Sequence, residues 1–334
     1  MTVSEVLAQY WADRTLRTTR TEQTNLRAAL LVVDALFSAL PVERFGAAEL
    51  EAVRDLLTDV ALVPGACRLL PTLRRRRGRL GLRTVNCRLN RIKAAFRWAA
   101  RRRLIPAEAW AGLSIVEGHT RTGGPGQPSP PRKVRPAAGK HVRAVLPFVS
   151  SRTVRAMVLV QMNTGMRSGE LCMMQVGDLD RSDPTCWVYR PRRHKTAGLG
   201  EEKVVGLGRR SQKAIARLVA GRPPGAFVFS PQRAVQETGG MGRYLPSRPR
   251  EHYTCDTYGR AVDRAVRRAI AAGKLAAADR WTPHQLRHQA GTVVRRKYGR
   301  DAAQVFLGHR RPEATDIYAE PPWGLAIDVA REIG

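Results

Sequence analysis

The sequence predicts a mainly α-helical protein with two helical domains and a small antiparallel β-sheet in the second. Apolar residues recur at three- and four-residue steps through much of residues 1–116, which predicts amphipathic helices. A Gly-, Pro- and Arg-rich segment, 117–136, interrupts this pattern and predicts a linker. In residues 137–334 helical patterns return, together with two strand-like runs, 186–189 and 203–207, that flank a polar loop. We therefore expect a helical domain, a basic linker and a larger domain that carries the sheet.

Three helices are expected in the first domain, over 26–40, 50–60 and 85–99. The third carries four basic residues away from its apolar face, Arg88, Arg91, Lys93 and Arg97. Charge runs most often form a solvated helix surface. Here the clustering of these basic residues in one small helical unit instead favours contact with the phosphates of a nucleic acid.

The second domain is expected to begin with helices near 142–146 and 154–162 and to be helical again from about Tyr258. The run 227–229 predicts either a short strand or a turn. Residues 231–256 are rich in Arg, Gly and Pro, so we expect a long loop there, a feature that is usually functional in a compact domain.

The charge balance indicates a polyanionic partner. The 334 residues include 58 Lys and Arg against 28 acidic residues, for a net charge of +30, while 43% of the residues are apolar, as in a globular protein. A biased genome composition would explain the preference for Arg over Lys but not the excess over acidic residues. Phosphate contacts with release of counterions explain that excess, so nucleic acid is the expected partner.

Cysteine usage and hydropathy bear on the compartment. The cysteines, five in number, are scattered and contain no Cys-x-x-Cys pair, which predicts a reducing compartment and no structural zinc. The N-terminus lacks the long apolar core of a signal peptide, and no apolar run reaches the ~18 residues of a membrane helix. We expect a cytoplasmic protein located on the nucleoid.

Six residues in the C-terminal half form an ordered series, and each lies in a short motif. They are Arg167 in Thr164–Leu171, Lys195 in His194–Thr196, His284 and Arg287 in His284–His288, His309 in Leu307–His309, and Tyr318 in Thr315–Glu320. Together these motifs resemble the tyrosine recombinase (phage integrase) family. The resemblance covers about the C-terminal half, and residues 15–110 are similar, more weakly, to the family's N-terminal core-binding domain.

The resemblance implies that residues 137–334 form the catalytic domain and that residues 1–116 clamp DNA. It implies that Tyr318 is the nucleophile, which cleaves DNA through a covalent 3′-phosphotyrosine and needs neither a cofactor nor a metal. Arg167 and Arg287 would hold the non-bridging oxygens of the scissile phosphate, a task that suits their planar guanidinium groups.

The resemblance also implies roles for the other members of the series. Lys195, on the hairpin loop, would protonate the departing 5′ oxygen, His284 would act as general base for the tyrosine, and His309 would hydrogen-bond the phosphate. Two supporting residues are expected beside them: Glu170, which could orient Arg167, and His288. On their own, Arg167 with Glu170 would be a structural ion pair and the loop lysine a solvated one.

The segment around His284 also has a local logic. Thr282 as N-cap, Pro283 at the first helical position and Gln285 three residues after the cap form a capping box, and the N-terminus of a helix favours an anion. His284 and His288, four residues apart, could alternatively bind zinc. Gln285 replaces the glutamate that a metalloprotease motif requires, so we favour the phosphate role.

As implied partners we expect double-stranded DNA at attachment sites, a homo-tetramer on a Holliday junction and an accessory directionality factor, with integration or excision of a mobile element as the outcome. Apolar residues at helical spacing in 324–334 suggest a C-terminal helix that docks on a neighbouring protomer. Two alternatives stay open: a type IB topoisomerase-like enzyme that relaxes DNA, and a non-catalytic DNA-binding regulator.

Overall fold

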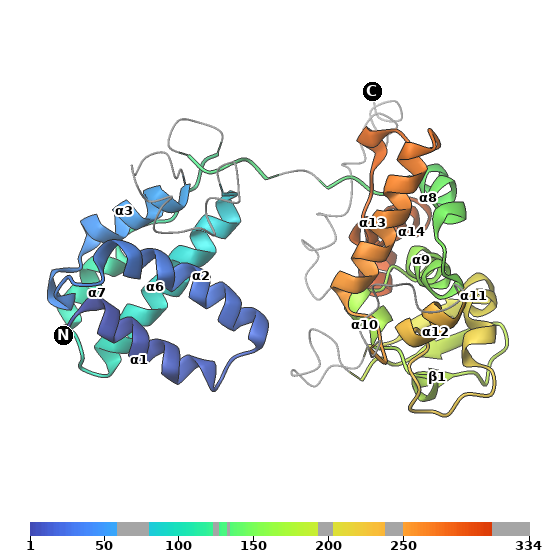
Figure 1. The fold of residues 1–334 in the computed structure, drawn as a ribbon, viewed down its shortest axis with the longest axis horizontal. Helices are drawn as coiled ribbons and strands as arrows, with labels where there is room; N and C mark the ends of the chain where they lie inside the picture. Colours follow the sequence, from blue (N-terminus) through green and yellow to red (C-terminus); the bar gives the residue numbers. More distant parts are fainter. Residues whose placement is uncertain (59–79, 123–126, 132–133, 193–202, 238–249, 309–334) are drawn as a thin grey trace, which may run out of the picture. The chain divides into compact units, whose positions relative to one another are not determined.

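The computed structural model describes residues 1–58, 80–122, 127–131, 134–192, 203–237 and 250–308. The chain separates into two compact units, Met1–Lys133 and Val134–Gly334 (Figure 1). The boundary lies inside the expected linker, after Lys133. The first residues of that linker belong to the first unit, because Asn86 Nδ2 donates to the carbonyl of His119 at 2.8 Å and accepts through Oδ1 from its backbone N–H at 3.0 Å.

The first unit is helical throughout its described regular elements. These are α1 (Val3–Thr15), α2 (Arg20–Phe37), a 3₁₀ turn (Val42–Arg44), α3 (Ala47–Thr58), α6 (Leu82–Arg101) and α7 (Ala107–Ser114). The apolar repeats that predicted helices near 26–40, 50–60 and 85–99 supply the buried faces of α2, α3 and α6. Phe45 stacks on Phe96 at 4.5 Å between ring centroids, which joins the turn after α2 to α6 in one core.

The second unit consists of helices around a small sheet, which confirms the predicted fold class. Its helices are α8 (Gly139–Val145), α9 (Arg152–Thr164), α10 (Ser168–Cys172), α11 (Arg209–Val219), α12 (Pro231–Glu237), α13 (Cys255–Ala271) and α14 (Pro283–Leu307). Short 3₁₀ turns lie at Leu146–Phe148, Val176–Asp178 and Ala277–Asp279. Within the described residues, no helix has the length and apolar character needed to cross a bilayer.

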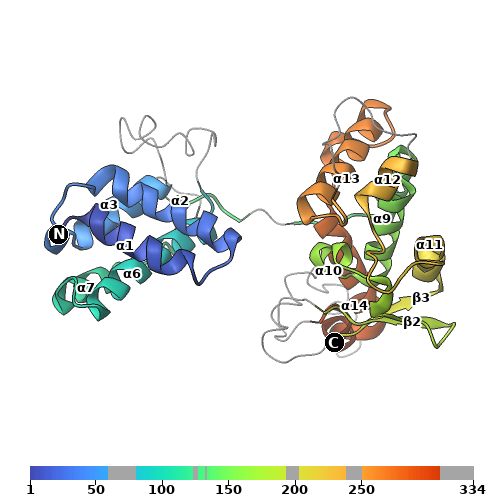
Figure 2. The ribbon, with the colours of Figure 1, turned by 60° about the horizontal axis from the view of Figure 1, so that its bottom comes forward.

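The sheet has three antiparallel strands in the order β1-β2-β3. They are β1 (Leu179–Asp180), β2 (Cys186–Tyr189) and β3 (Val205–Gly208), and the register pairs Tyr189 with both Leu179 and Val205. The predicted hairpin is therefore present, with one short strand added beside it. Val205 and Leu207 are buried, and α11 and α9 pack against this strand (Figure 2).

Two expectations for residues 227–256 need correction. The described part of the predicted long loop begins with α12, because Pro231 takes the first helical position after Ser230. Helix α13 starts at Cys255 rather than near Tyr258, since Thr254 and Thr257 form a capping box. Residues 238–249 lie outside the described residues. The run 227–229 makes only an isolated bridge, between Gln175 and Phe227.

Helix α14 is bent back on itself at Gly299, where φ is +88° and ψ is 178°. The bend brings Leu307, at the end of α14, against Gly291 and against Gly165, the left-handed C-cap of α9. A Cβ at Gly165 would lie 2.8 Å from Leu307 Cδ2 and 3.2 Å from Ala290 Cβ. Two helix ends far apart in the sequence therefore meet at a residue that must be glycine.

We expect Gly165→Ala to destabilise the second unit by about 2–4 kcal/mol, combining overpacking with the left-handed backbone. Gly221→Ala is the matched control. Gly221 also has a positive φ, +65°, but a Cβ there would meet nothing within 4 Å, so it should cost only about 1–2 kcal/mol. Urea unfolding of both variants measures the difference in their free energies of unfolding. Equal losses of stability would show that α9 and α14 do not pack tightly at Gly165.

Candidate active site

The turn between α9 and α10 places Arg167. Gly165 ends α9 in the left-handed conformation, and Arg167 is the N-cap of α10. The buried side chain of Gln161 braces this turn: its Nε2 donates to the carbonyl of Met166 at 3.2 Å and to Ser168 Oγ at 3.0 Å. Tyr258, fully buried on α13, donates in turn to Gln161 Oε1 at 3.0 Å. A buried polar network therefore fixes the backbone before Arg167.

Glu170 gathers two cations around one buried carboxylate. Its Oε1 accepts from Arg167 Nη1 at 2.9 Å, and its Oε2 accepts from the Arg167 backbone N–H at 2.9 Å and from Lys203 Nζ at 2.6 Å. The side chain of Glu170 is 3% exposed and that of Lys203 is 10% exposed, whereas that of Arg167 is 33% exposed. The buried carboxylate of Glu170 thus fixes the Arg167 guanidinium, and the Arg167 side chain stays partly exposed.

The charges of this cluster are mutually dependent. Burial by itself raises the pKa of Glu170, but Lys203 and Arg167 outweigh it and the pKa lies below its ordinary value, so Glu170 is ionised at neutral pH. Burial lowers the pKa of Lys203, Glu170 opposes that effect, and the positive charges of Arg167 and Arg287 add to the lowering. The surroundings of Lys203 therefore lower its pKa below the ordinary value, and Glu170 keeps that lowering smaller than burial alone would make it.

Arg287 lies at the base of the same cluster. It is 1% exposed, and its Nη1 and Nη2 donate to the carbonyls of Gly165 at 2.6 Å and Leu307 at 2.7 Å. The two carbonyls end α9 and α14, so the guanidinium ties the turn that leads to Arg167 to the chain that leads to His309. The sequence predicted Arg287 as a phosphate ligand but gave no sign of this bond to both helix ends.

His284 and His288 lie one turn apart on α14, and their ring centroids are 4.9 Å apart at 86°. Partial burial and the nearby cations Arg287 and Arg167 lower the pKa of His284. Burial, then His284 and Arg287, lower the pKa of His288 to about 4. Both rings are therefore neutral at pH 7. The expected cap is present in part, since the Thr282 backbone N–H donates to Gln285 Oε1 at 2.9 Å.

Three members of the predicted series, Lys195, His309 and Tyr318, lie outside the described residues, as does the tail 324–334. The described residues end directly before one of them. Gly308, which precedes His309, caps α14 in the left-handed conformation. A Cβ at Gly308 would lie 3.3 Å from Lys203 Cε, so the chain enters the His309 segment beside the cluster.

Sequence reasoning missed Lys203, Gln161, Tyr189 and Tyr258. Tyr189, fully buried on β2, donates to the backbone carbonyl of Glu170 at 2.8 Å and supports the cluster from the sheet side. The only available signal for Lys203 was the rarity of lysine, which occurs eight times against 50 arginines.

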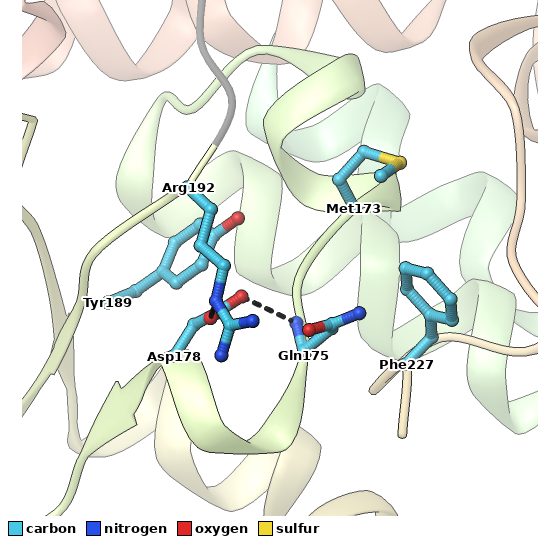
Figure 3. Close-up of a pocket in the computed structure, with 6 residues that line it drawn as sticks. All are labelled: Met173, Gln175, Asp178, Tyr189, Arg192 and Phe227. Carbon is cyan, nitrogen blue, oxygen red and sulfur yellow. Dashed lines mark hydrogen bonds and ion pairs between the residues drawn. The ribbon is translucent and has the colours of Figure 1, made fainter. Parts of the chain in front are cut away.

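A cavity of about 330 Å³ lies beside Tyr189 and the turn Val176–Asp178 (Figure 3). Its lining includes Tyr189, Asp178 and Arg192, and Arg192 Nε pairs with Asp178 Oδ1 at 2.6 Å. Of the predicted catalytic residues that the structure describes, none lines it, so we do not assign the reaction to this cavity. Among the described residues, no group of three or more His, Cys, Asp and Glu is arranged to hold a metal ion.

In the first unit, Arg91 and Lys93, which were predicted to contact DNA, bind other groups of the same unit. Arg91 makes a two-point ion pair with Glu22, with Nε to Oε1 and Nη2 to Oε2 both at 2.7 Å. Lys93 donates to the carbonyls of Ser114 and Val116. Arg97 is exposed, and Arg88 is half-buried. The structure thus brings Arg91 and Lys93 into the packing of α6 and leaves Arg97 at the surface.

Comparison with known structures places this fold among DNA-bound integrases. The integrase of transposon Tn1549 (residues 82–397), in complex with circular intermediate DNA, is similar over 99% of each chain, with a TM-score of 0.65 and 18% identity. A lambda integrase dimer bound to a COC′ core site is similar over 95% of this chain and 77% of that chain, with a TM-score of 0.63 and 16% identity. A lambda integrase tetramer bound to a Holliday junction gives a TM-score of 0.61 at 15% identity over 96% and 78%.

No curated protein sequence matches the chain. The model of the phage integrase family does match, over residues 141–322, which is more than half of the chain and includes all six residues of the predicted series. The same stretch contains α9, α10 and α14, whose ends meet at the Arg167 cluster. The chain therefore belongs to the phage integrase family.

Proposed function

We propose that this protein is a site-specific DNA recombinase that cleaves and rejoins double-stranded DNA through a 3′-phosphotyrosine on Tyr318. The observation that carries the proposal is the Glu170 cluster, in which one buried carboxylate positions Arg167 and Lys203 above the buried Arg287. The two cations on this carboxylate and the nearby charge of Arg287 form a site of net positive charge, which suits a phosphodiester that gains negative charge as it is attacked.

The site residues that the structure describes each have a proposed role in that reaction. Arg167 reaches the surface and donates to a non-bridging oxygen, while Glu170 fixes its orientation. Arg287 contributes a buried positive charge and ties the end of α9 to the end of α14 through the carbonyls of Gly165 and Leu307. His284 is neutral at pH 7 because its pKa is lowered, so it can accept the phenolic proton as general base. His288 packs beneath it as a neutral support.

The wider assembly belongs to the same proposal. We expect the protein to act as a homo-tetramer on two attachment sites, to pass through a Holliday junction and to integrate or excise a mobile element. The structural neighbours support this because they include an integrase tetramer on such a junction and a transposon integrase on circular intermediate DNA. The place of action would be the cytoplasmic nucleoid, with an accessory factor that sets direction.

A nicked suicide substrate tests the nucleophile. Wild-type protein should form a covalent adduct with DNA, Tyr318→Phe should form none, and Arg167→Ala should form it at least ~10²-fold more slowly, as for loss of a principal oxyanion donor. Tyr298→Phe is the matched control, because Tyr298 is 64% exposed on α14, and it should react like wild type.

An adduct that persists in Tyr318→Phe would refute Tyr318 as the nucleophile. A plasmid with and without paired attachment sites separates the proposed recombinase from a relaxing enzyme. Relaxation of both plasmids without exchanged products would favour a type IB topoisomerase-like activity.

A substrate with a bridging 5′-phosphorothiolate distinguishes the two lysines, since a thiolate leaves without needing a proton. We expect Lys195→Ala to cleave normal DNA at least ~10²-fold more slowly than wild type. On the sulfur substrate its cleavage rate should return to that of wild type, because the leaving group no longer needs a general acid. Lys203→Ala should be slow on both substrates, because it disturbs the position of Glu170 and Arg167. Lys274→Ala, an exposed lysine on the same unit, is the control. Recovery of Lys203→Ala alone would assign the acid to Lys203.

A further inference from the structure

A pair of cysteines joins the helix that carries the site to a neighbouring helix. Cys172 is the last residue of α10 and is 2% exposed, and Cys255 is the first residue of α13 and is exposed. The two thiols are close enough to shift each other's pKa. A Cβ at Gly169, on α10, would lie 3.7 Å from Cys255 Sγ, so Cys255 lies directly against α10.

The surroundings make the two thiols unequal. The interaction with Cys172 lowers the pKa of Cys255 to about 6, burial opposes this shift, and the Cys255 backbone N–H at the helix start adds to the lowering. The interaction with Cys255 and burial raise the pKa of Cys172. At neutral pH, Cys255 is therefore largely a thiolate that solvent can reach, with a buried thiol as its neighbour. A low-pKa accessible cysteine beside a second cysteine is the arrangement of oxidation-sensitive pairs.

We propose that Cys172 and Cys255 form a reversible disulfide when the protein meets hydrogen peroxide, and that this disulfide slows DNA cleavage. The second half rests on the function proposed above. Nothing in the reaction series uses either cysteine, so the pair is a separate modification site that acts on the active site through α10.

The chemistry balances with peroxide as the oxidant. The Cys255 thiolate attacks one peroxide oxygen, the O–O bond breaks, and the departing hydroxide takes a proton to become water. The Cys172 sulfur then attacks the sulfenic sulfur of Cys255, an S–S bond forms, and the S–O bond breaks. The leaving hydroxide takes the Cys172 proton and becomes a second water. Two thiols lose two electrons, and one peroxide gains them.

The disulfide reaches the active site because α10 is only five residues long. Glu170 lies two residues before Cys172 and is held at 2.9 Å from Arg167 and 2.6 Å from Lys203. A disulfide requires the sulfurs to approach to about 2.05 Å, well inside the separation of two free thiols. The approach draws the end of α10 toward α13 and displaces Glu170 and Arg167, and a shift of about 1 Å in a catalytic group can reduce a rate on the order of 10²-fold.

The test uses the full chain with the other cysteines replaced, Cys67→Ser, Cys87→Ser and Cys186→Ser, so that only the pair remains. Treatment with hydrogen peroxide should remove both titratable thiols and lower the mass by about 2 Da, the two hydrogens of the disulfide. Dithiothreitol should restore both. Peptide mapping without reduction should join the Cys172 and Cys255 peptides. Two thiols that survive, or sulfonic acid in place of the crosslink, would overturn the proposed disulfide.

The effect on function is measured on the same protein with the suicide substrate. Oxidised protein should cleave at least ~10-fold more slowly than reduced protein and recover with dithiothreitol. Cys255→Ser, which changes an exposed position, and Cys172→Ala should cleave like the reduced protein and be insensitive to peroxide. Equal rates before and after oxidation would refute the inhibitory role. The thiol and mass measurements use no DNA. The disulfide can therefore be confirmed or refuted even if the protein does not cleave DNA.

Discussion

The structure depends on one buried carboxylate with two cations around it. Glu170 is 3% exposed, and an ionised carboxylate there is tolerated only because Arg167 and Lys203 donate to it at 2.9 and 2.6 Å. The same bonds fix the direction of the Arg167 guanidinium and keep the nearly buried Lys203 charged beside Arg167 and Arg287. Removing the carboxylate would leave three positive charges close together without a counter-charge. Stability and the geometry of the site are therefore coupled through the same residue.

The fold around Glu170 explains how distant segments supply the cluster. Helix α9 ends at Gly165, the bent α14 ends at Leu307, and Arg287 donates to the carbonyls of both residues. Gln161 and Tyr189 add hydrogen bonds from α9 and β2 to the turn and to α10. These contacts are almost all buried, so the site belongs to the core of the second unit although Arg167 reaches the surface. The cysteines at the other end of α10 show that the same short helix also contacts α13.

Apolar periodicity and capping residues predicted α2, α3, α6, α8, α9, the start of α14 and the β2–β3 hairpin, because these signals are local. The motifs singled out Arg167, Glu170, Arg287 and His284 because each lies in a distinctive short segment, and their catalytic roles stay predictions. Lys203 could not be predicted, since a lysine at the start of a strand is ordinarily solvated and only tertiary packing places it on Glu170. The start of α12 was missed for a different reason: Ser230-Pro231 is a helix-start signal inside an Arg-, Gly- and Pro-rich segment whose composition favoured a loop. The ion pair of Arg91 could not be predicted because its partner, Glu22, is 69 residues away in the chain.

The central claim, that Glu170 supplies the counter-charge of the cluster, is tested most directly by following the Lys203 ammonium group with heteronuclear NMR as pH is raised. The resonance is assigned by its loss in Lys203→Arg. In the native protein the pKa of Lys203 should lie below its ordinary value of 10.5, because burial outweighs the attraction of Glu170. In Glu170→Gln the pKa should fall further, since burial and the charges of Arg167 and Arg287 then act unopposed. A pKa that is the same in both proteins would contradict the claim.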